Sequence, residues 1–152
     1  MGYRRLFIIR KDLSLTSGKL AAMVGHCAEA YWTRMIRDFK GMEHKVIEKY
    51  GGGSYYDVSF IVDGEIMNEY INGSFVKTIC QAKNRNQLLK AKTIATELGL
   101  VEGTDFGEIN DKCLTELTPE NEDGTTLVGI WFKPLPDEIA HKISKKYHLY
   151  MD

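Results

Sequence analysis

The hydrophobic and polar positions of the chain follow two patterns, one typical of strands and one typical of helices. Leu6-Phe7-Ile8-Ile9 is a continuous apolar run of the kind that is buried on both faces in a parallel or mixed sheet. Polar residues end this run at Arg10-Lys11-Asp12. From Leu20 onward, apolar residues recur at helical spacing, at Val24, Cys27, Ala28, Tyr31, Met35 and Phe39. The pattern predicts a strand and then an amphipathic helix, which Thr16 or Ser17 can cap.

The rest of the chain alternates between the same two patterns. Residues 56–62 and 65–70 flank Asp63-Gly64, a dipeptide favoured in tight turns, and predict a β-hairpin. A strand is predicted at 75–80, followed by a helix from Asn84 to Leu98 with Asn84 and Gln87 at its cap and Gly99 at its end. Farther on we expect a short strand or loop at 105–109, an exposed polar segment at 110–123, an apolar strand at 127–132 and a last helix from Pro136-Asp137.

This alternation predicts an α/β fold. We expect a three-layer sandwich in which a mixed, mostly parallel sheet of about four core strands is covered by helices on both faces. The predicted hairpin is an insertion, at about 42–72. A chain of 152 residues with ordinary apolar content suits one domain, spanning 1–152, with a single core.

Hydropathy and the spacing of cysteines and histidines indicate the cellular compartment and bear on disulfide formation and metal binding. No apolar run is long enough to span a membrane, and the start of the chain lacks the apolar core of a signal peptide, so we expect a cytoplasmic protein. Cys27, Cys80 and Cys113 are odd in number and widely spaced, which argues against a disulfide framework. The four histidines form no pair at ligand spacing and no C-x-x-C occurs, so neither a metal nor a cofactor is expected.

The segment Ser17-Gly18-Lys19-Leu20-Ala21-Ala22 is the strongest candidate for chemistry. It places Lys19 in the first turn of the predicted helix, where backbone N–H donors and a cation together suit an anion or a developing oxyanion. Met23 and His26 follow Lys19 on one side of that helix, away from the centre of its apolar face. A phosphate-binding P-loop is excluded, because Leu13 and Leu20 stand where its glycine and its hydroxyl residue would be.

The formal net charge of −1 excludes a grossly basic nucleic-acid binder but leaves room for a local patch. Basic residues gather in three segments: Arg4, Arg5, Arg10, Lys11 and Lys19; Lys83, Arg85, Lys90 and Lys92; and Lys142, Lys145 and Lys146. Each segment is either a solvated face or a surface for phosphate groups.

Four segments in order carry a family resemblance: Ile9-Arg10-x-Asp12-Leu13, Gly18-Lys19-Leu20-Ala21-Ala22-x-x-x-His26, Asp105-x-Gly107 preceded by Leu98-Gly99-Leu100, and Gly124-Thr125-Thr126-Leu127-Val128. Together they resemble the type 2 peptidyl-tRNA hydrolases. The resemblance covers most of the chain apart from the segment at about 42–72. It implies a homodimeric enzyme that cleaves the ester joining a peptide to tRNA, without a metal, and releases both products.

The resemblance also implies site residues. The catalytic candidates are Lys19, Asp105, Thr126 and His26, and the candidates for binding tRNA are Arg10, Lys11, Thr125, Lys83 and Arg85. In the chemistry that these residue types allow, Asp105 orients or activates a water, while Lys19 and Thr126 stabilise the oxyanion. Basic neighbours would hold tRNA phosphates without reading sequence.

The chain departs from the family pattern at several positions. Met23 stands where family members usually carry a glutamine, and Glu108-Ile109 stands where an arginine–threonine pair follows the aspartate and glycine. These departures leave open an alternative function, a catalytically degenerate member of the fold that binds RNA or a protein. Structural roles also remain open for Asp105 as a turn residue, Thr126 as a strand former and His26 as a histidine at the edge of the core.

Overall fold

The centre of the protein is a six-stranded sheet, seen in a computed structural model that describes residues 2–38, 47–48 and 54–151. Five strands lie in the order β5-β6-β1-β4-β8, and the sixth, β7, pairs with the start of β1. Their bounds are β1 (Tyr3–Arg10), β4 (Val76–Ala82), β5 (Phe106–Asp111), β6 (Thr126–Phe132), β7 (Leu135–Pro136) and β8 (His148–Leu149).

The sheet is mixed, as predicted, but only the β1–β4 pairing is parallel. Strand β6 returns directly from β5 through a loop, without a crossover helix, and inserts antiparallel between β5 and β1. The expectation of a mostly parallel sheet is therefore wrong for the pairing of neighbouring strands.

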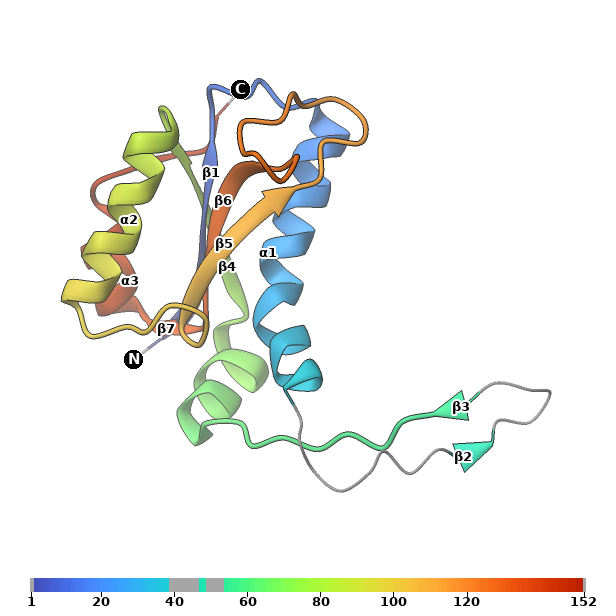
Figure 1. Cartoon of the computed structure of the whole chain (residues 1–152). Helices are drawn as coiled ribbons and strands as arrows, with labels where there is room; N and C mark the ends of the chain where they lie inside the picture. Colours follow the sequence, from blue (N-terminus) through green and yellow to red (C-terminus); the bar gives the residue numbers. More distant parts are fainter. Residues whose placement is uncertain (1, 39–46, 49–53, 152) are drawn as a thin grey trace.

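Helices cover both faces of the sheet, as predicted (Figure 1). Helix α1 (Ser17–Arg37) lies on one face, while α2 (Arg85–Glu97) and α3 (Asp137–Ser144) lie on the other. The two faces of β1 supply the two cores: Leu6 and Ile8 pack toward α2 and α3, and Phe7 and Ile9 pack toward α1. The α1 N-terminus and the ends of β1 and β5 meet at one end of the molecule (Figure 1).

Helix α1 begins where the cap was predicted. Thr16 is the cap, and its hydroxyl accepts the backbone N–H of Lys19 at 3.3 Å. The buried line of the helix runs through Met23, Cys27 and Tyr31, at i, i+4 and i+8. Met23 therefore belongs to the core and not to the side that carries Lys19, contrary to the sequence-based expectation. Phe39 lies outside the described residues.

The second and third helices follow their sequence signals. The side chain of Asn84 accepts the N–H of Gln87 at 2.9 Å and caps α2, which ends before Gly99 at a φ of +87°. Helix α3 begins directly after Pro136. Within the described part of the chain, no helix has both the length and the apolarity needed to cross a bilayer.

The predicted hairpin at Asp63-Gly64 is wrong. The Asp63 carboxylate instead accepts the N–H groups of Glu65 and Ile66 at 2.9 and 3.2 Å and starts the π-helix η1 (Ile66–Ser74). Ile66 and Tyr70, one helical turn apart, pack against Tyr3. A two-stranded ladder does occur earlier in the chain, between β2 (Ile47–Glu48) and β3 (Ser54–Tyr55), and the residues that join these strands lie outside the described part.

Candidate active site at the start of helix α1

Lys19 lies in the first turn of α1, as the sequence predicted. Its ammonium group donates a 2.8 Å hydrogen bond to Oδ1 of Asp111, the last residue of β5, and lies 3.4 Å from the hydroxyl of Thr115. The side chains of Lys19 and Asp111 are only 15% and 10% exposed. The helix start and the end of β5 therefore form a shielded ion pair beside a hydroxyl group.

The surroundings of Asp111 favour its ionised form. Partial burial, the largest single influence, acts to raise the pKa of this carboxyl. Hydrogen bonds from the Lys19 ammonium and from the backbone N–H of Cys113, together with the charges of Lys19 and His26, outweigh it and hold the pKa below its ordinary value. Asp111 is therefore a carboxylate at neutral pH and a weak proton acceptor.

The loop at residues 112–125, here called the 112–125 loop, crosses the start of α1. The Glu116 carboxylate accepts the Thr16 hydroxyl at 2.6 Å and approaches the Thr16 backbone N–H at 3.5 Å. Helix α1 has no acidic residue in its own first turn, so Glu116 provides the negative charge that a helix N-terminus favours. On the other side, a Cβ added to Gly18 would meet no atom within 4 Å, so open space adjoins Lys19 there.

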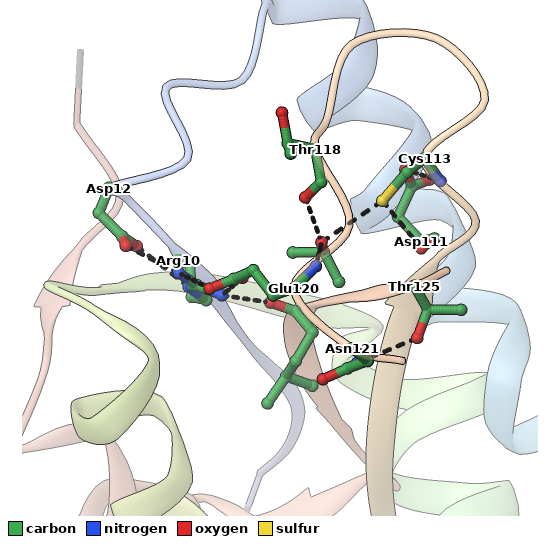
Figure 2. Close-up of polar contacts among 10 residues, drawn as sticks. Arg10, Asp12, Asp111, Cys113, Thr118, Glu120, Asn121 and Thr125 are labelled. Atoms are coloured by element: carbon green, nitrogen blue, oxygen red, sulfur yellow. Dashed lines mark hydrogen bonds and ion pairs between the residues drawn. The ribbon is translucent and has the colours of Figure 1, made fainter. Parts of the chain in front are cut away.

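Thr126 anchors this loop to the sheet. Its side chain is fully buried, donates a hydrogen bond to the Thr118 carbonyl at 2.7 Å and accepts the N–H of Glu120 at 3.1 Å. The Cys113 thiol lies 3.4 Å from the same hydroxyl (Figure 2). Thr126 pairs with Asp111 across the β5–β6 ladder and is thus close to the ion pair, but its hydroxyl is committed to the loop.

Arg10 does not present a free charge. It is buried, and its guanidinium binds the carboxylates of Asp12 and Glu120 and the Leu127 carbonyl (Figure 2). Lys11 donates to the Met151 carbonyl and lies 4.5 Å from the centre of the Tyr150 ring. The expectation that these two residues bind tRNA phosphates is not supported by these contacts, because each residue holds other parts of the chain.

Asp105 is not part of the Lys19 cluster. It lies just before β5, where its carboxylate accepts the Val101 N–H at 2.8 Å and forms a 2.8 Å ion pair with Lys133. Asp111 lies at the opposite end of this strand, about 20 Å away at the rise of an extended chain. The sequence-based grouping of Asp105 with Lys19 is therefore wrong, and Asp105 is a turn residue.

The remaining candidates lie at the surface or in the 112–125 loop. His26 is exposed on α1, and its charge influences Asp111. Lys83 and Arg85 are exposed at the start of α2. The Thr125 hydroxyl accepts a hydrogen bond from the Asn121 side chain at 3.0 Å (Figure 2). It also donates to the Asp123 carboxylate at 2.6 Å, and so Thr125 stabilises the end of the loop.

Asp111, Thr115 and Glu116 are candidate site residues that the sequence pattern does not predict, because they lie in the segment expected to be polar and exposed. Asp111 lies 92 residues from Lys19, so no local pattern joins them. The signal that was available is the spacing Asp-x-x-x-Thr from Asp111 to Thr115, which repeats the order of the family's aspartate and threonine.

Comparison with known proteins identifies the family. Residues 3–150 match the family model described as Peptidyl-tRNA hydrolase PTH2. A peptidyl-tRNA hydrolase of Thermococcus sibiricus is 27% identical over 93% of this chain and 92% of its own length, and one of Thermoplasma acidophilum is 23% identical over 96% and 97%.

A solved structure from Agrobacterium tumefaciens strain C58, of a protein of unknown function, shares the fold. Its TM-score is 0.50 with 11% identity, over 99% of both chains. The family match spans both the α1 start that carries Lys19 and the β5 end that carries Asp111. The chain belongs to the peptidyl-tRNA hydrolase PTH2 family.

Proposed function

We propose that this protein hydrolyses the ester bond of peptidyl-tRNA, and that Lys19, Asp111 and Thr115 form its active site. The observation that carries the proposal is the 2.8 Å ion pair between Lys19 and Asp111 at the N-terminus of α1. A cation, a carboxylate and a hydroxyl converge there beside helix N–H groups, and such groups can polarise an ester carbonyl, orient a water and stabilise the charge that develops.

The family pattern supports Asp111 over Asp105. Family members carry an aspartate, a glycine two residues later, and then an arginine–threonine pair. Beginning at Asp111, Thr115 stands at the threonine position and Cys113 at the glycine position. Cys113 has a φ of +59°, in the left-handed region that glycine adopts most readily. Two positions, Cys113 in place of the glycine and Leu114 in place of the arginine, depart from the pattern in residue type.

The groups have distinct roles in the proposed reaction. Lys19 binds the ester carbonyl and stabilises the negative charge that develops on its oxygen. The lowered pKa of Asp111 makes it a poor proton acceptor, so its main role is to orient the attacking water and the Lys19 ammonium. The Thr115 hydroxyl, which is exposed, is a further donor or acceptor for the water. Met23 is buried and contributes no donor.

Substrate binding completes the proposal. The exposed cations Lys83 and Arg85, at the start of α2, are the sequence-derived candidates best placed to contact tRNA phosphates, because their side chains face solvent. We include in the proposal a homodimer, which the resemblance implies, and a cytoplasmic location, where translation forms the substrate. A catalytically degenerate binding module is the less favoured alternative, since the family match is accompanied by an intact lysine–carboxylate pair.

The experiment is hydrolysis of N-acetylaminoacyl-tRNA by the wild type, by Lys19→Ala and by a control, Lys112→Ala. Lys112 is an exposed lysine beside Asp111, so its removal matches the charge change. Lys19→Ala should lower kcat by about a hundredfold or more, as expected when an oxyanion donor is lost, while Lys112→Ala keeps the wild-type kcat. An inert wild type on intact substrate, with a known hydrolase working in parallel, would establish the binding module instead.

A further inference from the structure

A hollow of about 510 Å³ lies away from the Lys19–Asp111 pair, between the C-terminal half of α1 and the first residues of β5. Helix α1 contributes Ala30, Arg34 and Arg37, and the opposite wall includes Gly107 and Trp131. Its volume is within the range of ligand sites. None of the roles proposed above uses this hollow.

Small residues keep the hollow open. Ala30 and Gly103 line it without long side chains, and Gly107 cannot be replaced without movement. A Cβ at Gly107 would lie 2.7 Å from Nε1 of Trp131, well inside van der Waals contact. The close approach of this glycine to the indole therefore shapes the wall of the hollow opposite α1.

Arg34 faces the hollow with unused hydrogen-bonding capacity. Its Nε–H group is buried and, among the described residues, has no hydrogen-bond partner. The guanidinium carbon lies 5.5 Å from the centre of the Tyr31 ring, and Nη1 lies 3.5 Å from a carboxylate oxygen of the mostly exposed Asp38. A buried donor without an acceptor is costly, so a bound acceptor at this position would be favourable.

A second cation adds to this charge, and the acids of the hollow are already paired. Arg37 lines the same wall, one turn from Arg34, and donates to the Thr33 hydroxyl at 3.3 Å. Glu102 and Glu108 both bind Lys92 of α2, at 2.8 and 2.5 Å. Lys92 thus draws both carboxylates toward α2, away from the guanidinium groups on α1.

We propose that Arg34 and Arg37 form a subsite for a phosphate group, and that the phosphate belongs to the backbone of the tRNA substrate. Planar guanidinium groups bind phosphate through paired hydrogen bonds, and Arg34 has the spare donor. Arg34 lies 15 residues after Lys19 along α1, about 22 Å away at the helical rise. A polymer can reach both positions, and the subsite positions it without taking part in the chemistry. This inference rests on the proposed function for its substrate.

The test compares Arg34→Gln with the wild type in binding of deacylated tRNA across a range of salt concentrations. Arg34→Gln should weaken binding about tenfold at low salt and should reduce the slope of log affinity against log salt by about one. Arg34→Lys keeps the positive charge but loses the paired donors of the planar guanidinium group. It should therefore retain the salt slope while binding tRNA more weakly than the wild type does. Lys142→Gln, on α3 and the other face of the sheet, is the matched control and should change neither quantity.

Kinetics and a small-anion probe separate the possible outcomes. In N-acetylaminoacyl-tRNA hydrolysis, Arg34→Gln should raise KM and leave kcat unchanged, since the contact forms equally in the ground and transition states. Wild-type affinity and salt slope in a folded Arg34→Gln variant would overturn the subsite. Binding of inorganic phosphate is measured for the same two proteins. If Arg34→Gln loses phosphate binding while its tRNA binding is unchanged, the hollow is a site for a free small anion, and the tRNA assignment is overturned. If the wild type shows no turnover but Arg34→Gln still binds tRNA more weakly than the wild type does, the subsite is supported and the proposed function is refuted.

Discussion

Lys19 and Asp111 are a pair in which each side chain compensates for the partial burial of the other. With exposures of 15% and 10%, neither charge is well solvated, so removing one partner leaves the other shielded and unpaired. The pair therefore contributes more to function, because it holds two charged groups in one geometry, than it contributes to the net stability of the fold. For the same reason, the contribution of the pair to the stability of the fold depends on pH.

A Lys19→Met variant should raise the pKa of Asp111, because it removes the strongest hydrogen bond and the nearest positive charge while burial remains. In the wild type the folded-state pKa is lower than that of the unfolded chain, so the pair stabilises the fold at neutral pH. That contribution disappears as the pH falls through the folded-state pKa. Carboxyl NMR titration of both proteins measures the shift. An Asp111 titration unchanged by Lys19→Met would contradict the pairing.

At the scale of elements, the 112–125 loop connects the active site to the sheet. Glu116 reaches the α1 cap, Glu120 reaches Arg10, and Thr126 binds the loop backbone from below. Thr126 has the family's expected residue type, but its contacts are those of an anchor. Its effect on catalysis should therefore operate through the position of Thr115 and Asp111.

Thr126→Val should lower the free energy of unfolding by about 1–3 kcal/mol, because it leaves the Glu120 N–H and the Thr118 carbonyl without their buried partner. Thr126→Ser keeps the hydroxyl and should restore most of this loss. Denaturant unfolding measures stability, and hydrogen exchange at the Glu120 amide should accelerate only in the valine variant. A roughly hundredfold loss of kcat in Thr126→Val with wild-type stability would instead assign Thr126 an oxyanion role.

The molecule as a whole depends on a buried arginine that joins its layers. Arg5 of β1 is 1% exposed and donates to the Phe132 carbonyl of β6 at 2.6 Å and to the Cys27 and Ala28 carbonyls of α1 at 3.0 and 3.1 Å. Burial lowers the pKa of Arg5 to about 10, so it stays charged at neutral pH. It thereby fixes α1, which carries Lys19, against the sheet, which carries Asp111.

Arg5→Met should destabilise the fold by about 3 kcal/mol, since it removes three charge-assisted hydrogen bonds from the interior. Arg4→Met is the neighbouring control. Arg4 is 32% exposed and binds one carboxylate, on Asp137, so its loss should cost less than about 1 kcal/mol. Thermal or denaturant unfolding distinguishes the two, and equal losses would show that Arg5 does not join the layers as described.

The sequence predicts those parts of the structure whose signal lies within a few neighbouring residues. The β1 run, the α1 cap at Thr16 and the α2 cap at Asn84 were predictable because each lies within a few residues. Asp63-Gly64 is ambiguous in the sequence, because an aspartate can either start a helix or open a hairpin. The signal for the helix is the spacing of Ile66 and Tyr70, which lie one helical turn apart and pack together against Tyr3. Asp105 matches the family's aspartate in the sequence because Gly107 lies two residues after it, whereas the residue two positions after Asp111 is Cys113, whose glycine-like φ of +59° is visible only in the structure.

The most direct test of the active-site assignment compares kcat for Asp111→Asn with kcat for Asp105→Asn in hydrolysis of N-acetylaminoacyl-tRNA, with both variants first shown to be folded. The two substitutions are chemically identical and lie at opposite ends of β5. If Lys19 and Asp111 form the site, Asp111→Asn should lose about a hundredfold or more in kcat, while Asp105→Asn should keep the wild-type kcat and lose only stability, from its Lys133 ion pair and its hydrogen bond with Val101. Full activity of Asp111→Asn, with kcat lost in Asp105→Asn, would place the catalytic carboxylate at Asp105 and contradict a site built on Lys19 and Asp111.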